Sequence, residues 1–218
     1  MIIKHYELKK NLKGKNNFFL LYGHNSGLIE EIIDKDLKPI FSKNIFKYDE
    51  SEILSDISAF KEGLVNKSFF ENDKLIIINR VSDKILDIVK EICDQKDEDL
   101  KIILKSGNLE KKSKLRNFFE KSKNLIIVPF YEDTHQSLLF VAQRFFKENK
   151  IKISPQNINY IIENSKGNRI NLKNELEKIK NFSQKKLSVE LNEIIKLTNL
   201  AENYNISELT DQCLAKNK

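Results

Sequence analysis

Five short apolar runs, separated by segments in which apolar residues recur at helical spacing, dominate the first 130 residues of the chain. The third run contains Leu75 to Ile78 and shows no alternation of apolar and polar residues, which is typical of a parallel strand covered on both faces. Strands that alternate with helices predict a doubly wound α/β sheet, because right-handed crossovers place helices on both of its faces. We therefore expect five parallel strands, over residues 18–22, 45–48, 74–79, 100–104 and 125–130.

Helical spacing between these runs predicts the layers that cover the sheet. Asp49 and Glu52 form a capping-box pattern, which predicts one helix from there through Phe60. Apolar residues also recur at helical spacing over 28–34, 85–92 and 113–119. Each of these segments lies between two predicted strands, as the doubly wound arrangement requires.

After Tyr131 the pattern changes to helices alone. Four helical stretches follow, over about 133–148, 154–165, 171–182 and 188–197. The second has a clear start signal, with Ser154 as the N-cap and Pro155 at the first helical position. The chain is thus predicted to have an α/β domain over 1–132, a small all-α domain over 133–200, and a linker or the start of a further domain over 201–218.

The first run ends at the loop from Gly23 to Gly27, where a nucleotide-binding protein of this class would hold its phosphates. A Walker A loop needs a Lys after the last Gly and then a Ser or Thr for magnesium, but Leu28 and Ile29 stand there. The strand over 74–79 ends in Asn79 rather than in the acid that would order the metal. We expect a structural turn here rather than a nucleotide site, with neither cofactor nor metal.

No other catalytic pattern is present in the sequence. The histidines at 5, 24 and 135 lie in unrelated segments, and Cys93 and Cys213 lack the spacing of a zinc site. No Gly-x-Ser-x-Gly elbow or Cys/His pair with an orienting acid occurs. We expect no intrinsic enzymatic activity.

Charge and hydropathy indicate the cellular location of the protein more clearly than they indicate its binding partner. The chain has 38 Lys and Arg against 32 Asp and Glu, a formal net charge of +6. This balance is compatible with nucleic acid, but opposite charges alternate almost everywhere, so the total discriminates weakly. No apolar run reaches the roughly 18 residues of a membrane helix, and the first residues lack a secretory signal pattern. We expect a cytoplasmic protein.

Phe69 and Phe70 form an adjacent aromatic pair among polar residues, just before the third apolar run. Adjacent residues point in different directions, so both rings cannot easily enter one core. An exposed ring at such a place is a candidate interface anchor, and ordinary core packing is the alternative.

Several motifs occur in an order and spacing that resemble the N-terminal two-thirds of the delta subunit of the bacterial DNA polymerase III clamp loader. They are Phe19 to Gly23, Ser68-Phe69-Phe70 followed by Leu75 to Ile78, Leu104 to Leu115, Gly167-Asn168-Arg169, and Asn174 to Ile179. The resemblance implies an AAA+-type P-loop-like domain with a parallel five-stranded sheet and no ATPase activity. It also implies a helical lid domain and a C-terminal collar domain that builds the pentameric loader.

The resemblance further implies a non-catalytic subunit of the DNA polymerase III holoenzyme in DNA replication. Such a subunit binds and opens the sliding clamp (beta subunit), works with the delta prime and gamma/tau subunits, and contacts primed DNA. Any DNA-directed DNA polymerase (nucleotidyltransferase) activity would belong to the holoenzyme. Phe69 and Phe70 match the hydrophobic plug that enters the clamp, although family members often carry Leu-Phe there.

Lys111, Lys112, Lys114 and Arg116 precede or open the helix predicted over 113–119 and are candidate DNA contacts. A helix N-terminus with nearby cations suits a phosphate, and a solvated basic face is the alternative.

The chain departs from the resemblance after Leu200, where a collar domain would follow, whereas the sequence stops at Lys218. We expect a fragment, a truncated product or a reduced form. Two other functions remain open at this point. A nucleotide-binding P-loop NTPase or regulator would show nucleotide affinity, and a general DNA-binding α/β protein would bind duplex without clamp affinity.

Overall fold

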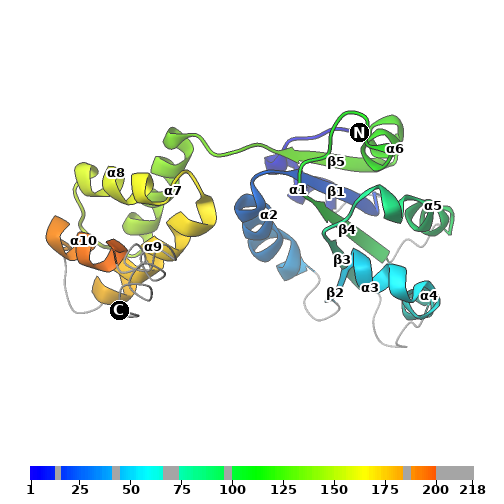
Figure 1. Ribbon diagram of the computed structural model, residues 1–218, viewed down its shortest axis with the longest axis horizontal. Coiled ribbons are helices and arrows are strands. Elements are labelled where there is room, and N and C mark those ends of the chain that lie inside the picture. The colour runs from blue at the N-terminus through cyan, green and yellow to red at the C-terminus, as the bar shows by residue number, and fades with distance from the viewer. Residues whose placement is uncertain (13–15, 41–44, 66–73, 96–99, 184–187, 200–218) are drawn as a thin grey trace, which may run out of the picture. The chain divides into compact units, whose positions relative to one another are not determined.

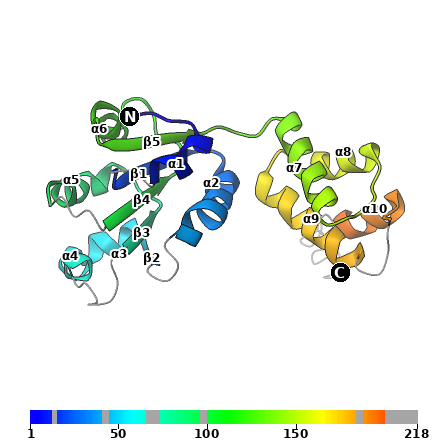
Figure 2. The same ribbon diagram turned by 180° about the vertical axis from the view of Figure 1, so that it is seen from behind.

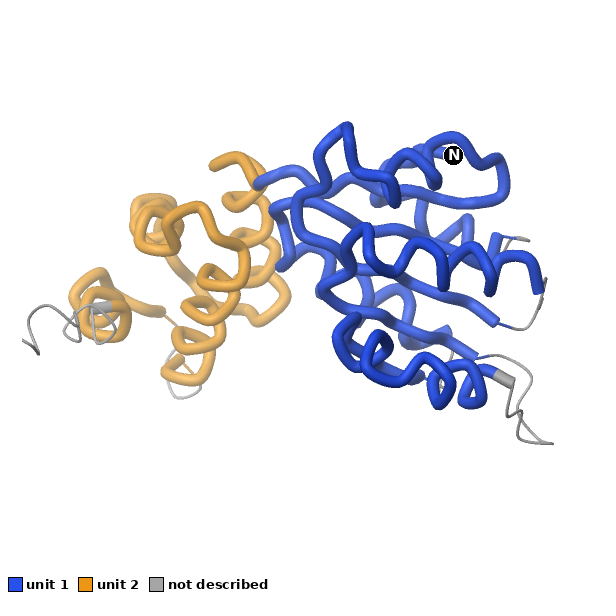
Figure 3. The backbone as a smooth tube through the Cα atoms, turned by 45° about the vertical axis from the view of Figure 1, so that its right-hand side comes forward, with its two compact units in different colours: residues 1–132 blue, residues 133–218 orange. Residues whose placement is uncertain are grey.

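The computed structural model describes residues 1–12, 16–40, 45–65, 74–95, 100–183 and 188–199. The chain divides into two compact units, residues 1–132 and 133–218, which Figure 3 shows in different colours. Each unit has its own apolar core and is described separately below.

Unit 1 is built on a five-stranded parallel sheet with the strand order β2-β3-β4-β1-β5 (Figure 1). The strands are β1 (Phe18–Gly23), β2 (Ile45–Asp49), β3 (Lys74–Asn79), β4 (Leu100–Ser106) and β5 (Leu125–Phe130). The five predicted parallel strands are confirmed. Because β1 lies between β4 and β5, the loops that leave β1 and β4 start side by side at the carboxyl edge of the sheet.

Helices cover both faces of the sheet (Figures 1 and 2). One face carries α3 (Glu50–Ser55), α4 (Ile57–Val65), α5 (Leu86–Asp94) and α6 (Lys114–Lys121). The other carries α1 (Leu8–Leu12) and α2 (Ser26–Ile32), which continues as a π-helix over Ile33–Leu37. Short 3-10 turns occupy His5–Glu7, Lys38–Ile40 and Asp83–Ile85.

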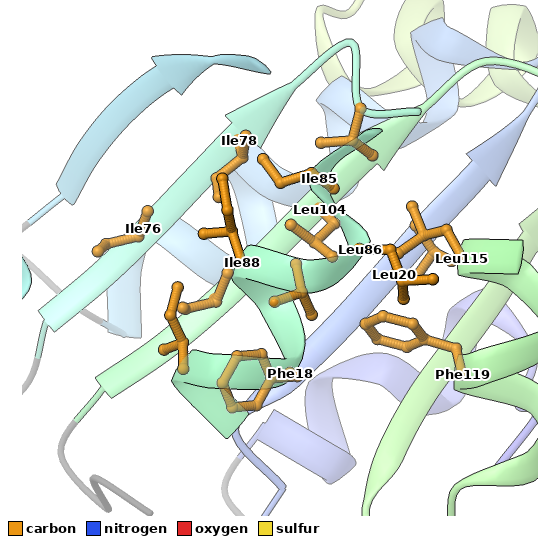
Figure 4. Packing of buried hydrophobic residues seen from close by; sticks show 14 of the residues in the cluster. Phe18, Leu20, Ile76, Ile78, Ile85, Leu86, Ile88, Leu104, Leu115 and Phe119 are labelled. Carbon is orange, nitrogen blue, oxygen red and sulfur yellow. The ribbon is translucent and has the colours of Figure 1, made fainter. Parts of the chain in front are cut away.

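Strand β1 shows how the sequence produces this layering. Successive side chains of a strand point to opposite faces, so Phe18 and Leu20 pack under α5 and α6 (Figure 4), whereas Phe19 packs under α1 and α2. These side chains are all buried, which is why the run contains no polar residue.

The predicted helix from Asp49 through Phe60 is wrong as a single element. The capping box is present, with the carboxylate of Glu52 accepting the backbone N–H of Asp49 at 2.9 Å. However, Asp56 leaves the helical conformation with φ −145°, and its carboxylate accepts the backbone N–H of Ala59 at 2.9 Å. Asp56 thus ends α3 and caps α4, because its side chain competes for backbone hydrogen bonds.

Helix α1 and the pairing of the N-terminal residues with β5 have no counterpart in the sequence prediction. Ile3 donates its backbone N–H to the carbonyl of Ile127 at 3.1 Å, and Ile127 donates to the carbonyl of Met1 at 3.0 Å. These residues extend the sheet beyond β5, and α1 then covers the α2 face.

The described residues of unit 2 contain α7 (His135–Glu148), α8 (Pro155–Asn164), α9 (Arg169–Ser183) and α10 (Leu191–Asn199). The four predicted helices are confirmed. Ser154 caps α8 as expected, since its hydroxyl accepts the backbone N–H of Asn157 at 3.2 Å. The core is formed by apolar residues of all four helices, including Leu138, Ile161 and Leu176. Within the described ranges of either unit, no helix has the length and apolar character needed to span a membrane.

Candidate functional site

The loop after β1 is held by a close backbone contact at Gly23 and by hydrogen bonds of the Asn25 side chain. Gly23 has φ +136°, and a Cβ at this position would lie 2.1 Å from the carbonyl oxygen of Phe130, so only glycine fits. The buried side chain of Asn25 accepts the backbone N–H of Leu28 at 3.0 Å and donates to the carbonyl of Tyr131 at 3.0 Å. A backbone N–H of the α2 N-terminus, the kind of group that cradles phosphate in a P-loop, is therefore already bonded.

Beside this loop, a polar network joins the ends of two strands to α2. The ammonium of Lys105, in β4, donates to the side-chain oxygen of Asn79 at 2.9 Å and to a carboxylate oxygen of Glu30. Asn79 stands at the position where a P-loop ATPase has an acid that orders the metal ion, and its side-chain oxygen accepts a hydrogen bond from the Lys105 ammonium. The ammonium of Lys105, paired with Glu30, therefore occupies the place next to Asn79.

The segment from Gly107 to Ser113 follows β4 and lies next to the Gly23 loop, because Gly23 donates its N–H to the carbonyl of Gly107 at 3.0 Å. Lys111 and Lys112 are exposed in this segment, and Lys114 is exposed at the start of α6. We call these three residues the lysine cluster. The ion pair of Lys112 with Glu110 is largely exposed, so it neutralises the cluster only weakly.

Arg116 does not share the exposure of the lysine cluster. Its guanidinium donates to Glu120 at 2.8 Å and to the carbonyl of Leu109 at 2.9 Å, and it lies 5.1 Å from the ring centre of Tyr22. Asn117 also donates to this segment, at the carbonyl of Lys111 over 2.9 Å. Both α6 residues therefore fasten the segment that presents the lysines.

The N-terminus of α6 is occupied by a carboxylate that sequence reasoning missed. Asp83 accepts the hydroxyl of Ser113 at 2.6 Å and the backbone N–H groups of Lys114 and Leu115 at 3.0 Å each. These hydrogen bonds, that of Ser113 first, lower the pKa of Asp83. The carboxylate of Asp83 would repel a phosphate from these N–H groups. Within this segment, a phosphate would instead bind to the ammonium groups of the lysine cluster. Asp83 lies about thirty positions before α6, and no local pattern connects the two.

Phe69 and Phe70, the predicted clamp contacts, lie outside the described residues. The described residues on either side are Val65, which ends α4, and Lys74, which begins β3. The ammonium of Lys74 donates to the carbonyl of Gly63 in the last turn of α4.

The Gly167-Asn168-Arg169 motif builds the start of α9. Gly167 has φ +72°, and the side chain of Asn168 accepts the backbone N–H of Ile170 at 2.8 Å. Arg169 makes two parallel hydrogen bonds to the carboxylate of Asp133, at 2.7 and 2.9 Å, and the two side chains are 10% and 5% exposed. The motif is thus engaged within unit 2.

The sequence was compared with family models and with curated proteins. No family model matches the sequence. Over 197 residues the chain is 25% identical to the probable DNA polymerase III subunit delta of Rickettsia prowazekii, an alignment that covers 84% of the chain and 56% of the relative. The chain therefore spans little more than half the length of this curated relative.

Two solved structures share the fold at low sequence identity. The Bacillus subtilis DNA clamp loader delta protein is similar with a TM-score of 0.57 and 14% identity, over 98% of this chain and 72% of that one. The Thermotoga maritima RuvB Holliday junction branch migration motor is similar with a TM-score of 0.59 and 12% identity, over 89% and 65%. The resemblance to the delta subunit is confirmed, and the two solved structures share the fold of this chain.

Proposed function

We propose that this chain is a non-catalytic, delta-type clamp-loader subunit of DNA polymerase III, which binds the sliding clamp and helps to open it for loading onto primed DNA. The similarity to a delta subunit over 84% of the chain carries the proposal. Its other partners are the delta prime and gamma/tau subunits.

The carboxyl edge of the sheet supports a role without nucleotide hydrolysis. Asn25 bonds a backbone N–H at the start of α2, and the ammonium of Lys105 lies beside Asn79, where a metal ion would be ordered. Asn25 competes with a phosphate for this N–H group, and the positive charge of Lys105 disfavours a magnesium ion beside Asn79. Polymerase activity then belongs to the holoenzyme and not to this chain.

Phe69 and Phe70 are the proposed clamp contacts. The test is a binding measurement between the purified full chain and the cognate clamp, with the double variant Phe69→Ala, Phe70→Ala expected to lose binding. Phe140 supplies a control, because its side chain is 64% exposed on α7 and Phe140→Ala removes one exposed aromatic ring from unit 2. Undiminished binding by the double variant would remove this assignment.

The lysine cluster is the proposed DNA contact, with Arg116 holding the segment that presents it. Reversal of the charges of Lys111, Lys112 and Lys114 is expected to weaken duplex binding. It should also flatten the dependence of binding on salt, by about 0.9 in the logarithmic slope for each phosphate that the variant no longer neutralises. Lys121 and Lys123, exposed at the other end of α6, provide the control reversal. Equal weakening by both variants would show that the cluster has no special role.

A further inference from the structure

Tyr131 is the most exposed large apolar side chain among the residues that the structure describes, at 78%. It directly follows β5, and its backbone carbonyl accepts the side-chain N–H of Asn25 at 3.0 Å. This hydrogen bond holds the backbone of Tyr131 at the loop after β1. The residue is therefore fixed in place while its ring remains accessible to a ligand.

Tyr131 and the lysine cluster flank the loop after β1. Because β1 lies between β4 and β5, the segments that follow β4 and β5 leave the sheet about 10 Å apart, two strand spacings (Figure 1). Gly23 touches both, since it pairs with Phe130 in the register and donates its N–H to the carbonyl of Gly107 at 3.0 Å. The exposed ring and the exposed lysines thus belong to one edge of the sheet.

Arg116 provides a second connection between the ring and the lysines. Its guanidinium donates to the carbonyl of Leu109, in the segment that presents the lysine cluster, and lies 5.1 Å from the ring centre of Tyr22. The pKa of Arg116 is raised, first by its hydrogen bond to Glu120. Interactions with the hydroxyl groups of Tyr22 and Tyr131 raise this pKa further, so the Tyr131 hydroxyl lies within electrostatic reach of the guanidinium.

An exposed aromatic ring beside cations matches the chemistry of a single strand of nucleic acid. The phosphates of such a strand bind ammonium groups, and its unpaired bases stack on aromatic rings. In a duplex the bases are already stacked on one another and present only their edges to the grooves. A ring that stacks on bases therefore adds affinity for a single strand and none for a duplex.

We propose that Tyr131 and the lysine cluster together bind single-stranded DNA. The ring of Tyr131 stacks on an unpaired base, and the ammonium groups of Lys111, Lys112 and Lys114 bind the phosphates beside it. On primed DNA, the unpaired part of the template supplies such a strand. The inference rests on the proposed function and deepens it, because it names the form of DNA that this edge of the sheet prefers.

The experiment measures binding of the full chain, at low salt, to three labelled probes. They are an oligothymidylate, an oligonucleotide of the same length made of abasic sites, and a duplex with the same number of phosphates. Wild type is expected to bind the oligothymidylate about tenfold more tightly than the abasic probe, which corresponds to about 1.4 kcal/mol. Because the phosphates of these two probes are alike, only the bases can cause the difference.

Tyr131→Ala is expected to lose this tenfold preference and to bind the abasic probe and the duplex as wild type does. Tyr131→Phe, which keeps the ring, is expected to stay within about twofold of wild type on all three probes. Because Asn25 bonds the backbone of Tyr131 and not its ring, both variants are expected to keep the wild-type unfolding temperature.

Phe140→Ala is the matched control. Phe140 is 64% exposed on α7, and Arg144 follows it by one helical turn, so it is also an exposed ring near a cation. This variant is expected to bind all three probes as wild type does.

Clamp binding is measured on the same proteins. An undiminished preference for the oligothymidylate in Tyr131→Ala, or an equal loss in Phe140→Ala, overturns the inference and, where the clamp is bound, leaves the proposed function standing. Loss of clamp binding in Tyr131→Ala with unchanged DNA binding would make the ring a protein contact and also overturns the inference. A wild-type chain that does not bind the clamp overturns the proposed function and the inference with it.

Discussion

The turns from β1 to α2 and from β4 to α6 leave neighbouring strands at the same edge of the sheet, yet they use their helix N-termini differently. The first turn is closed by an amide, Asn25, and presents no cation of its own. The second is closed by a carboxylate, Asp83, and places Lys111, Lys112 and Lys114 at the surface. In both turns a side chain of the protein bonds backbone N–H groups of the following helix, and of the two turns only the second also presents exposed lysine side chains.

The sharpest test of the first turn is Gly23→Ala. The added Cβ would lie 2.1 Å from the carbonyl oxygen of Phe130, and the backbone has φ +136°, so we expect a loss of at least about 3 kcal/mol in the free energy of unfolding. Denaturant unfolding measures it. Gly107→Ala, in the second turn, is the control, because nothing lies within 4 Å of its added Cβ. Similar losses in the two variants would contradict the close approach seen at Gly23.

Asp83→Ala tests the carboxylate of the second turn. It leaves two backbone N–H groups of α6 and the Ser113 hydroxyl without their acceptor, for which we expect about 1 to 2 kcal/mol of destabilisation. Because the hydrogen bonds lower the pKa of Asp83, its contribution is present above the ordinary pKa of an aspartate and is lost as the pH falls through the lowered value.

The measurement is unfolding as a function of pH for wild type and Asp83→Asn. The gap between them should narrow as the pH falls below about 4, near the unperturbed pKa of aspartate. A gap that stays constant with pH would show that the carboxylate charge is not what stabilises α6.

Asn25→Ala opens the first turn without adding a clash. Loss of the N-cap of α2 and of the bond to Tyr131 should cost about 1 kcal/mol. The variant should still show no binding of magnesium and ATP by calorimetry, because Lys105 remains at the end of β4. Heat of nucleotide binding in the variant would show that Asn25 alone closes this edge.

Charge reversal of the lysine cluster has the smallest expected effect on stability, within about 0.5 kcal/mol, because these side chains are exposed. Arg116→Ala should cost more, since the guanidinium holds Leu109 and Glu120. Thermal unfolding of both variants checks which of them is destabilised more. The reverse order would mean that the lysines, and not Arg116, fix the segment after β4.

The fold was predictable because its signals are local. Buried runs such as Leu75 to Ile78 and the cap at Ser154 identify their elements without any knowledge of neighbours. The break at Asp56 and the closure of α6 by Asp83 were not predictable in this way. Asp56 lies within a continuous helical pattern, and Asp83 acts on residues that are distant in sequence.

The candidate site also has features that the sequence predicts locally and features that only the folded chain shows. The missing lysine and acid of the phosphate loop were evident from Leu28 and Asn79, since residue identity alone decides them. The inward direction of Arg116 depends on Glu120, Leu109 and Tyr22 together, which only the folded chain reveals.

The buried pair of Asp133 with Arg169 has a practical consequence for dissecting the molecule. Asp133 is the first residue of unit 2, and its partner Arg169 is 10% exposed at the start of α9. A recombinant fragment of unit 2 that begins at residue 133 retains the counter-charge, whereas one that begins at His135, the first residue of α7, leaves a guanidinium inside the fragment without this carboxylate. The choice of start codon two residues earlier or later therefore decides whether the fragment keeps this buried ion pair.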